Sequence, residues 1–233
     1  MTPMERALER IKAAGGKLVD GKWEVPVNLD LSCLGLTKLP PLRKVGGDFY
    51  CNHNKLTSLE GAPEKVVGGF YCVHNQLTSL KGAPQKVGED FFCYSNHLTS
   101  LKGAPREVVG IFDCSSNHLT SLEGAPREVG ENFYCNDNRL TSLQGAPEKV
   151  VGGFYCGRNL LTSLEGAPRE VGGSFYCNNN RLPAGETYEK WRASQNADSS
   201  EPAVAVQRQP ATKHAKKSSE LVSRLFGDLG RCL

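Results

Sequence analysis

Seven cysteines recur at a constant spacing along this sequence, and cysteine is a residue type that can do chemistry. They stand 21 residues apart, at Cys51, Cys72, Cys93, Cys114, Cys135, Cys156 and Cys177. Structural zinc sites favour C-x₂-C pairs with ligands converging from different directions, and no such pair occurs here. A nucleophilic thiol needs exposure and an electropositive setting. We therefore expect a buried ladder of free thiols that pack as small apolar side chains, with no metal and no cofactor.

The cysteines belong to a repeated unit that runs from about Gly46 to Leu182. One copy, residues 70–87, reads FYCVHNQLTSLKGAPQKV. On a strand, Phe70 and Cys72 point to one side and Tyr71 to the other. Asn75 follows the strand, where its amide can bond backbone groups of neighbouring coils, and each GAP segment forms a turn. The elements that position the cysteines are therefore stacked coils, each with a short strand.

The pattern V-x₃-F-x-C-x₂-N-x-L-x₂-L resembles the leucine-rich-repeat frame, with Phe and Cys replacing strand leucines. The short period, without a helical stretch in each unit, is similar to the bacterial class found in ubiquitin-ligase effectors. LDLSCLGLTKLPPL (29–42) is the best local match, and LTSLxGAPxxV resembles repeats of bacterial and phage proteins. The resemblance implies a mainly β solenoid with parallel strands on its concave face. It does not imply ligase activity, because only about 50 residues follow Leu182, too few for the separate catalytic domain.

Five segments follow from this pattern. Residues 1–27 form an N-terminal cap, a helix with a Thr2–Glu5 capping box followed by a hairpin around Asp20–Gly21. Residues 28–185 form the solenoid, whose divergent first unit keeps the frame's cysteine as Cys33. Residues 186–194 form a C-terminal cap, and 195–218 a flexible basic linker. Residues 219–233 form a short amphipathic helix, whose apolar face docks on a partner or folds back as a cap: Leu221, Val222, Leu225, Phe226 and Leu229.

The outward side chains are the candidate binding residues. The residue before each cysteine should form a column of rings interrupted by an aspartate: Tyr50, Tyr71, Phe92, Asp113, Tyr134, Tyr155 and Tyr176. Such rings either stabilise the sheet by stacking or present a recognition surface. Positions two and four after each cysteine vary and would add polarity, and they include His53, His74, His97, His118, Arg139 and Arg158. We expect the histidine pairs to be surface residues and not metal ligands.

Charge and hydropathy limit the function classes. The net charge is +3, and residues 201–233, with six basic and three acidic side chains, account for it. The repeats are close to neutral, which argues against a nucleic-acid groove. No secretory signal appears, and no apolar run approaches the roughly 20 residues of a membrane span. Nine cysteines without a secretion signal favour a reducing compartment, so we expect a cytoplasmic protein, delivered into a host cell if it is an effector.

The function that the sequence favours is non-catalytic binding of a partner protein through the concave aromatic face. An alternative is an adaptor or effector that recruits an enzyme through its C-terminal helix. A third is single-stranded nucleic-acid binding by stacked aromatic rings and the basic tail.

Overall fold

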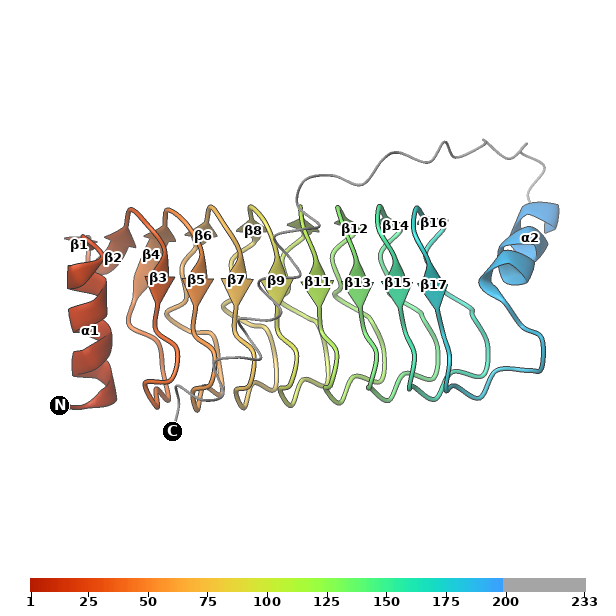
Figure 1. Ribbon diagram of the computed structural model, residues 1–233, viewed down its shortest axis with the longest axis horizontal. Coiled ribbons are helices and arrows are strands. Elements are labelled where there is room, and N and C mark those ends of the chain that lie inside the picture. The colour runs from red at the N-terminus through yellow and green to blue at the C-terminus, as the bar shows by residue number, and fades with distance from the viewer. Residues whose placement is uncertain (199–233) are drawn as a thin grey trace. The chain divides into compact units, whose positions relative to one another are not determined.

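The chain folds as a solenoid of stacked coils, described for residues 1–198 of a computed structural model, with side chains through Gln195 (Figure 1). Each coil contributes one strand to each of two sheets, and strands one repeat apart pair in parallel, with Phe70 opposite Phe91. The leucine-rich-repeat fold expected from the sequence is confirmed. The second strand of each coil, which ends at the repeat's valine, was not predicted.

Sheet A contains, in spatial order, β1 (Lys17–Val19), β2 (Lys22–Val25), β4 (Leu42–Val45), β6 (Lys65–Val66), β8 (Lys86–Val87), β10 (Glu107–Val108), β12 (Glu128–Val129), β14 (Lys149–Val150) and β16 (Glu170–Val171). Sheet B contains β3 (Leu29–Asp30), β5 (Phe49–Tyr50), β7 (Phe70–Tyr71), β9 (Phe91–Phe92), β11 (Phe112–Asp113), β13 (Phe133–Tyr134), β15 (Phe154–Tyr155) and β17 (Phe175–Tyr176). Figure 1 shows the strands of sheet B side by side along the solenoid.

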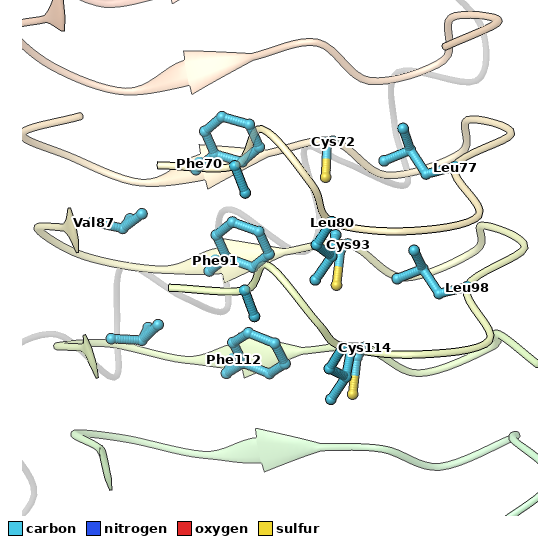
Figure 2. Close-up of a cluster of buried hydrophobic side chains, with 14 of the residues drawn as sticks. Phe70, Cys72, Leu77, Leu80, Val87, Phe91, Cys93, Leu98, Phe112 and Cys114 are labelled. Atoms are coloured by element: carbon cyan, nitrogen blue, oxygen red, sulfur yellow. The ribbon is translucent and has the colours of Figure 1, made fainter. Parts of the chain in front are cut away.

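The core lies between the sheets and repeats from coil to coil (Figure 2). Phe70, Cys72, Leu77 and Leu80 are fully buried, and the ring of Phe70 stacks on that of Phe91 at a centroid distance of 5.2 Å. The predicted buried ladder is confirmed, because all seven cysteines of the 21-residue series are free and six are buried. Burial raises the pKa of the Cys72 thiol, so the ladder is unreactive.

A second ladder, of asparagine side chains, closes each coil where its strand ends. The Nδ2 of Asn75 donates to the carbonyl of Cys72 at 3.2 Å and to that of Cys51, one coil earlier, at 2.9 Å. Its Oδ1 accepts the backbone N–H of Leu56 at 3.1 Å. The bonding to neighbouring coils predicted for this residue is confirmed, and it satisfies backbone groups that the short strands leave unpaired.

The first coil corrects the sequence reading of Cys33. Leu29 pairs with Phe49 and Asp30 with Tyr50, which places Leu31, and not Cys33, in the cysteine position of the frame. Cys33 instead has a positive φ of 58°. The first unit is one residue shorter than the others. Keeping the usual interval between the cysteine position and the next leucine, Leu36, places Leu31 and not Cys33 at the cysteine position.

Both ends of the solenoid are covered. Helix α1 (Pro3–Ala13) has the predicted capping box, and it buries Ala7 and Ile11 in the core. The predicted hairpin is formed by β1 and β2. At the other end, helix α2 (Tyr188–Asp198) places the ring of Tyr188 on that of Phe175, with centroids 4.3 Å apart. These contacts shield the outermost coils from water.

Candidate protein-binding face of sheet B

The outer side of sheet B, here called the B face, presents three columns of side chains that the core does not use. The aromatic column is Asp30, Tyr50, Tyr71, Phe92, Asp113, Tyr134, Tyr155 and Tyr176. Two residues earlier stands the acceptor column, Asn28, Asp48, Gly69, Asp90, Ile111, Asn132, Gly153 and Ser174. Two residues later stands the third column, Ser32, Asn52, Val73, Tyr94, Ser115, Asn136, Gly157 and Asn178. No position of these columns carries Lys or Arg, whereas four carry Asp.

The rings of the aromatic column stack along the solenoid in two groups. Tyr50 and Tyr71 are parallel with centroids 4.7 Å apart, and Tyr71 meets the edge of Phe92 at 5.3 Å. In the second group, Tyr155 lies 4.5 Å from Tyr134 and 5.1 Å from Tyr176. The predicted column of rings is therefore confirmed, with Asp113 between the groups. Sequence reasoning missed Asp30 at its head because the first coil had been placed in the wrong register.

The two groups differ in burial. Tyr71 and Phe92 are only 1% and 2% exposed, whereas Tyr176 is 52% exposed, and Tyr134 and Tyr155 are half-buried. An open groove of about 630 Å³ lies over the second group. The groove is lined by residues of the aromatic column, of the third column and of the position that directly follows the third column in the sequence. These residues are Tyr134, Asn136, Asp137, Tyr155, Gly157, Arg158, Tyr176, Asn178 and Asn179. A partner can reach these rings without rearranging the fold.

The carboxylates of the acceptor column have a structural task. Asp48 Oδ1 accepts the backbone N–H of Gly69 at 2.9 Å, and Asp90 Oδ1 accepts that of Ile111 at 2.8 Å. Asn132 does the same for Gly153 at 2.7 Å, so an amide oxygen suffices for this bond. Burial raises the pKa of the Asp90 carboxyl to about 6.

Asp113, in the aromatic column, resembles Asp90 in having a carboxyl group that accepts hydrogen bonds and whose pKa is raised by burial. Its Oδ1 accepts the N–H and the O–H of Ser115, at 2.9 and 2.6 Å. Burial nevertheless raises the pKa of Asp113 to about 6. At neutral pH the B face thus holds carboxylates whose ionised form is only partly solvated, and a cation placed against them would stabilise that form.

The residue two positions after each cysteine has a constrained backbone. His53, His74, Ser95, Ser116, Asp137, Arg158 and Asn179 all have φ between 51° and 56°. Asn, Asp and His tolerate this left-handed conformation better than most residues, so backbone geometry selects most of the types found here. The sequence reading treated these positions as freely variable.

The histidines form stacked pairs. The rings of His53 and His74 lie 4.5 Å apart, and those of His97 and His118 lie 5.8 Å apart. Burial, followed by the proximity of His53, lowers the pKa of His74. Arg139 is exposed, and neither it nor any of these histidines lines the groove. In residues 1–198, no three His, Cys, Asp or Glu side chains are grouped as a metal site would need.

Two further expectations concern the ends of the chain and the membrane. No helix in the described part of the chain has the length and apolarity to cross a bilayer. The predicted docking residues Leu221, Val222, Leu225, Phe226 and Leu229 lie outside the described residues.

Stacked coils with paired short strands and a ladder of asparagines define a leucine-rich-repeat solenoid. No protein-family model matches the sequence, and no curated protein matches it. Among solved structures, the chain is similar to the leucine-rich-repeat domain of a Shigella effector, with a TM-score of 0.60 and 24% identity over 85% of this chain and 84% of that one. It is also similar to YopM, a leucine-rich effector protein from Yersinia pestis, with a TM-score of 0.46 and 21% identity. That match covers 76% of this chain and 54% of YopM.

Proposed function

We propose that this protein is a binding module that recognises a partner protein through the B face, and that it does so without chemistry of its own. The observation that carries the proposal is the groove over Tyr134, Tyr155 and Tyr176. These rings lie outside a core that Phe, Cys, Leu and Val already complete, so packing alone does not require them. Tyrosine combines a large apolar contact area with a hydroxyl, and it is enriched at binding hot spots.

The charge of the B face favours a protein over a nucleic acid. Carboxylates at Asp30, Asp48, Asp90 and Asp113, with no Lys or Arg in the three columns, would repel a phosphodiester backbone. Stacked tyrosines could accept bases, but a single-stranded nucleic acid also needs a cationic path for its phosphates. The same features suit a protein segment that brings apolar and basic side chains together.

The experiment is affinity capture from the native cell, comparing the wild type with the double substitution Tyr155→Ala and Tyr176→Ala. We expect the amount of captured partner to fall at least about 10-fold, because each of two hot-spot residues contributes about 1–2 kcal/mol or more of binding free energy. The half-buried and exposed positions of these rings allow the variant to fold, which circular dichroism checks. Buried Tyr71 is unsuited to this test because its removal would leave a cavity.

A matched control is available on the other side of the solenoid. Val67 and Val109 are 48% and 66% exposed, and they follow the strands of sheet A. The double substitution Val67→Ala and Val109→Ala should leave capture unchanged. Loss of capture in this control, with retention in the tyrosine variant, would move the binding surface to sheet A.

A further inference from the structure

The last strand of sheet B, β17, has unused backbone hydrogen-bond donors along its outer edge. In every coil from β5 to β15, three N–H groups donate to carbonyl oxygens of the next coil, as Phe154 does to Ser174 at 2.9 Å. The corresponding groups of the last coil are the N–H groups of Phe175, Cys177 and Asn179. Within residues 1–198 these three groups have no protein acceptor, because β17 ends the sheet (Figure 1). Backbone N–H groups are strong donors, so this edge offers three of them to a ligand.

The opposite end of sheet B is closed by the chain itself. Strand β3 begins the sheet there, and Arg10 Nη1 donates to the carbonyl oxygens of Asp30 and Ser32 at 3.0 and 3.2 Å. Arg6 Nη2 donates in the same way to the carbonyl oxygen of Leu34 at 2.9 Å. Proteins commonly cover an edge strand, since its unpaired backbone groups are a template for a further strand. Side chains of α1 therefore occupy the first edge of sheet B, whereas the last edge stays available.

Helix α2 covers the core beside β17 and not the outward side of the strand. The ring of Tyr188 lies on that of Phe175 with centroids 4.3 Å apart, and its hydroxyl donates to the carbonyl oxygen of Pro168 at 2.8 Å. The helix thus takes the place that the phenylalanine of a further coil would fill. On the outward side, Ser174 is exposed and Tyr176 is 52% exposed.

Tyr176 ends the aromatic column with one ring face uncovered. Tyr155 stacks on its other face with centroids 5.1 Å apart, and no further ring of residues 1–198 contacts it. Aromatic rings pair favourably at such distances, so this open face suits a ring of a ligand. Exposed Asn178 and Asn179 lie next along the chain, and both line the groove that also contains Tyr176. The open edge and the groove therefore form one continuous surface.

The electrostatic field at the middle of this edge is negative. Burial raises the pKa of the Cys177 thiol, and the nearby charges of Glu189 and Glu186 raise it further. Neither carboxylate forms an ion pair within the described part of the chain. A basic side chain of a ligand at this edge would be attracted to them.

We propose that β17 is a docking edge, and that the partner protein supplies an extended segment which pairs with β17 as one more parallel strand. The segment's carbonyl oxygens accept the N–H groups of Phe175, Cys177 and Asn179. It carries an aromatic side chain that stacks on Tyr176, small side chains on either side of that residue, where Tyr188 leaves little room, and a basic side chain after them. This inference rests on the proposed function, because it names the kind of segment by which that partner binds.

The probe for this edge is the synthetic peptide Ac-SGYSNK-NH2, added to the full wild-type chain. Amide hydrogen exchange, followed by NMR, should slow at least about 10-fold at Phe175, Cys177 and Asn179 with millimolar peptide, because a bonded amide exchanges only when its bond opens. Exchange at Val151, beside sheet A, should not change. Unchanged exchange at all three amides would overturn the proposal. Slowing that appears without peptide as the protein concentration rises would also overturn it, since a second copy would then occupy the edge.

Two N-methylated peptides form a matched pair that distinguishes strand pairing from binding in the groove alone. In each coil the residue after the ring donates its N–H to the following coil, as Cys156 does to Tyr176 at 2.8 Å. The N–H of the peptide's tyrosine therefore faces β17, and that of the next serine faces away. Methylating the tyrosine nitrogen should weaken binding at least about 10-fold, and methylating the serine nitrogen less than about 3-fold.

Equal effects of the two methyl groups would overturn strand pairing. That result would leave partner capture through the B face standing, because capture is measured with the native partner and the tyrosine variant. Conversely, undiminished capture by that variant would refute the proposed function, whereas a tenfold difference between the two methylated peptides would still establish β17 as a strand-pairing edge.

Discussion

Replacing Asp90 by asparagine should make this protein more stable at neutral pH. The Asp90 side chain is only 9% exposed, and its Oδ1 accepts the Ile111 N–H at 2.8 Å. An asparagine keeps that acceptor, as Asn132 does for Gly153. What the substitution removes is the cost of ionising a buried carboxyl. Most substitutions of buried polar residues destabilise proteins, so the predicted direction is distinctive.

The magnitude follows from the pKa shift. Burial raises the pKa of Asp90 from 3.8 to about 6. Because the folded-state pKa lies above the unfolded one, the carboxyl's contribution to stability is fully present below pH 4 and is lost as the pH rises through 6. The difference of about 2.2 pKa units corresponds to ~3 kcal/mol. Asp90→Asn should therefore raise the free energy of unfolding by ~2–3 kcal/mol at pH 7.5 and change it little at pH 4.

The assay is urea unfolding followed by circular dichroism at pH 4 and pH 7.5. Glu107→Gln, at an exposed position in sheet A, is the matched control and should change stability by less than about 0.5 kcal/mol at either pH. A variant that is no more stable than the wild type at pH 7.5 would refute the reasoning. An equal gain at both pH values would also refute it, because the gain would then not come from the carboxyl's ionisation.

Three further substitutions or reagents probe the scaffold. Asn96→Ala removes the acceptor of the buried Leu77 N–H, whereas each carbonyl to which Asn96 donates keeps a second donor. Chemical denaturation should therefore show that the free energy of unfolding falls by ~1–3 kcal/mol. A loss below about 0.5 kcal/mol would contradict the role of the asparagine ladder. Gly103→Ala introduces a Cβ at φ +94°, within 2.8 Å of the preceding coil's backbone, and thermal unfolding should show a cost above the ~1–2 kcal/mol of a left-handed residue alone. Within the 21-residue series of thiols, a thiol-reactive disulfide at pH 8 should modify half-buried Cys177 first and the other six only on unfolding. Rapid modification of all seven would show that the ladder is open to solvent.

Much of the solenoid could be predicted from the sequence because the same packing and the same hydrogen bonds recur in each unit. One unit containing Phe70, Cys72 and Asn75 sets the inward side chains and the bonding of neighbouring coils, and the same solution recurs every 21 residues. The short second strand ending at Val66 was not predicted, because two residues carry no alternating pattern. The assignment of Cys33 to the cysteine position was wrong because it followed the residue type and not the number of residues between that position and Leu36.

The candidate site was predicted less completely. The order of rings in the aromatic column followed from the strand period, but the exposure of each ring depends on its neighbours in three dimensions. The acceptor column escaped notice because Asp48, Gly69 and Asp90 share no residue type. Asp48 and Asp90 share a hydrogen bond in which the side-chain oxygen accepts the backbone N–H of the next coil, a bond that Gly69 cannot make and that only the stacked structure displays. The positive φ at His53 and Arg158 likewise leaves little trace in a single sequence.

Binding through the B face is the central claim, and side-chain footprinting of the captured complex tests it most directly. Hydroxyl radicals oxidise tyrosine side chains at rates that follow their exposure, so the free protein and the complex can be compared residue by residue. The account predicts that oxidation of Tyr155 and Tyr176 falls several-fold in the complex, while that of Val109, beside sheet A, does not change. Protection of Val109 with unchanged oxidation of both tyrosines would contradict it.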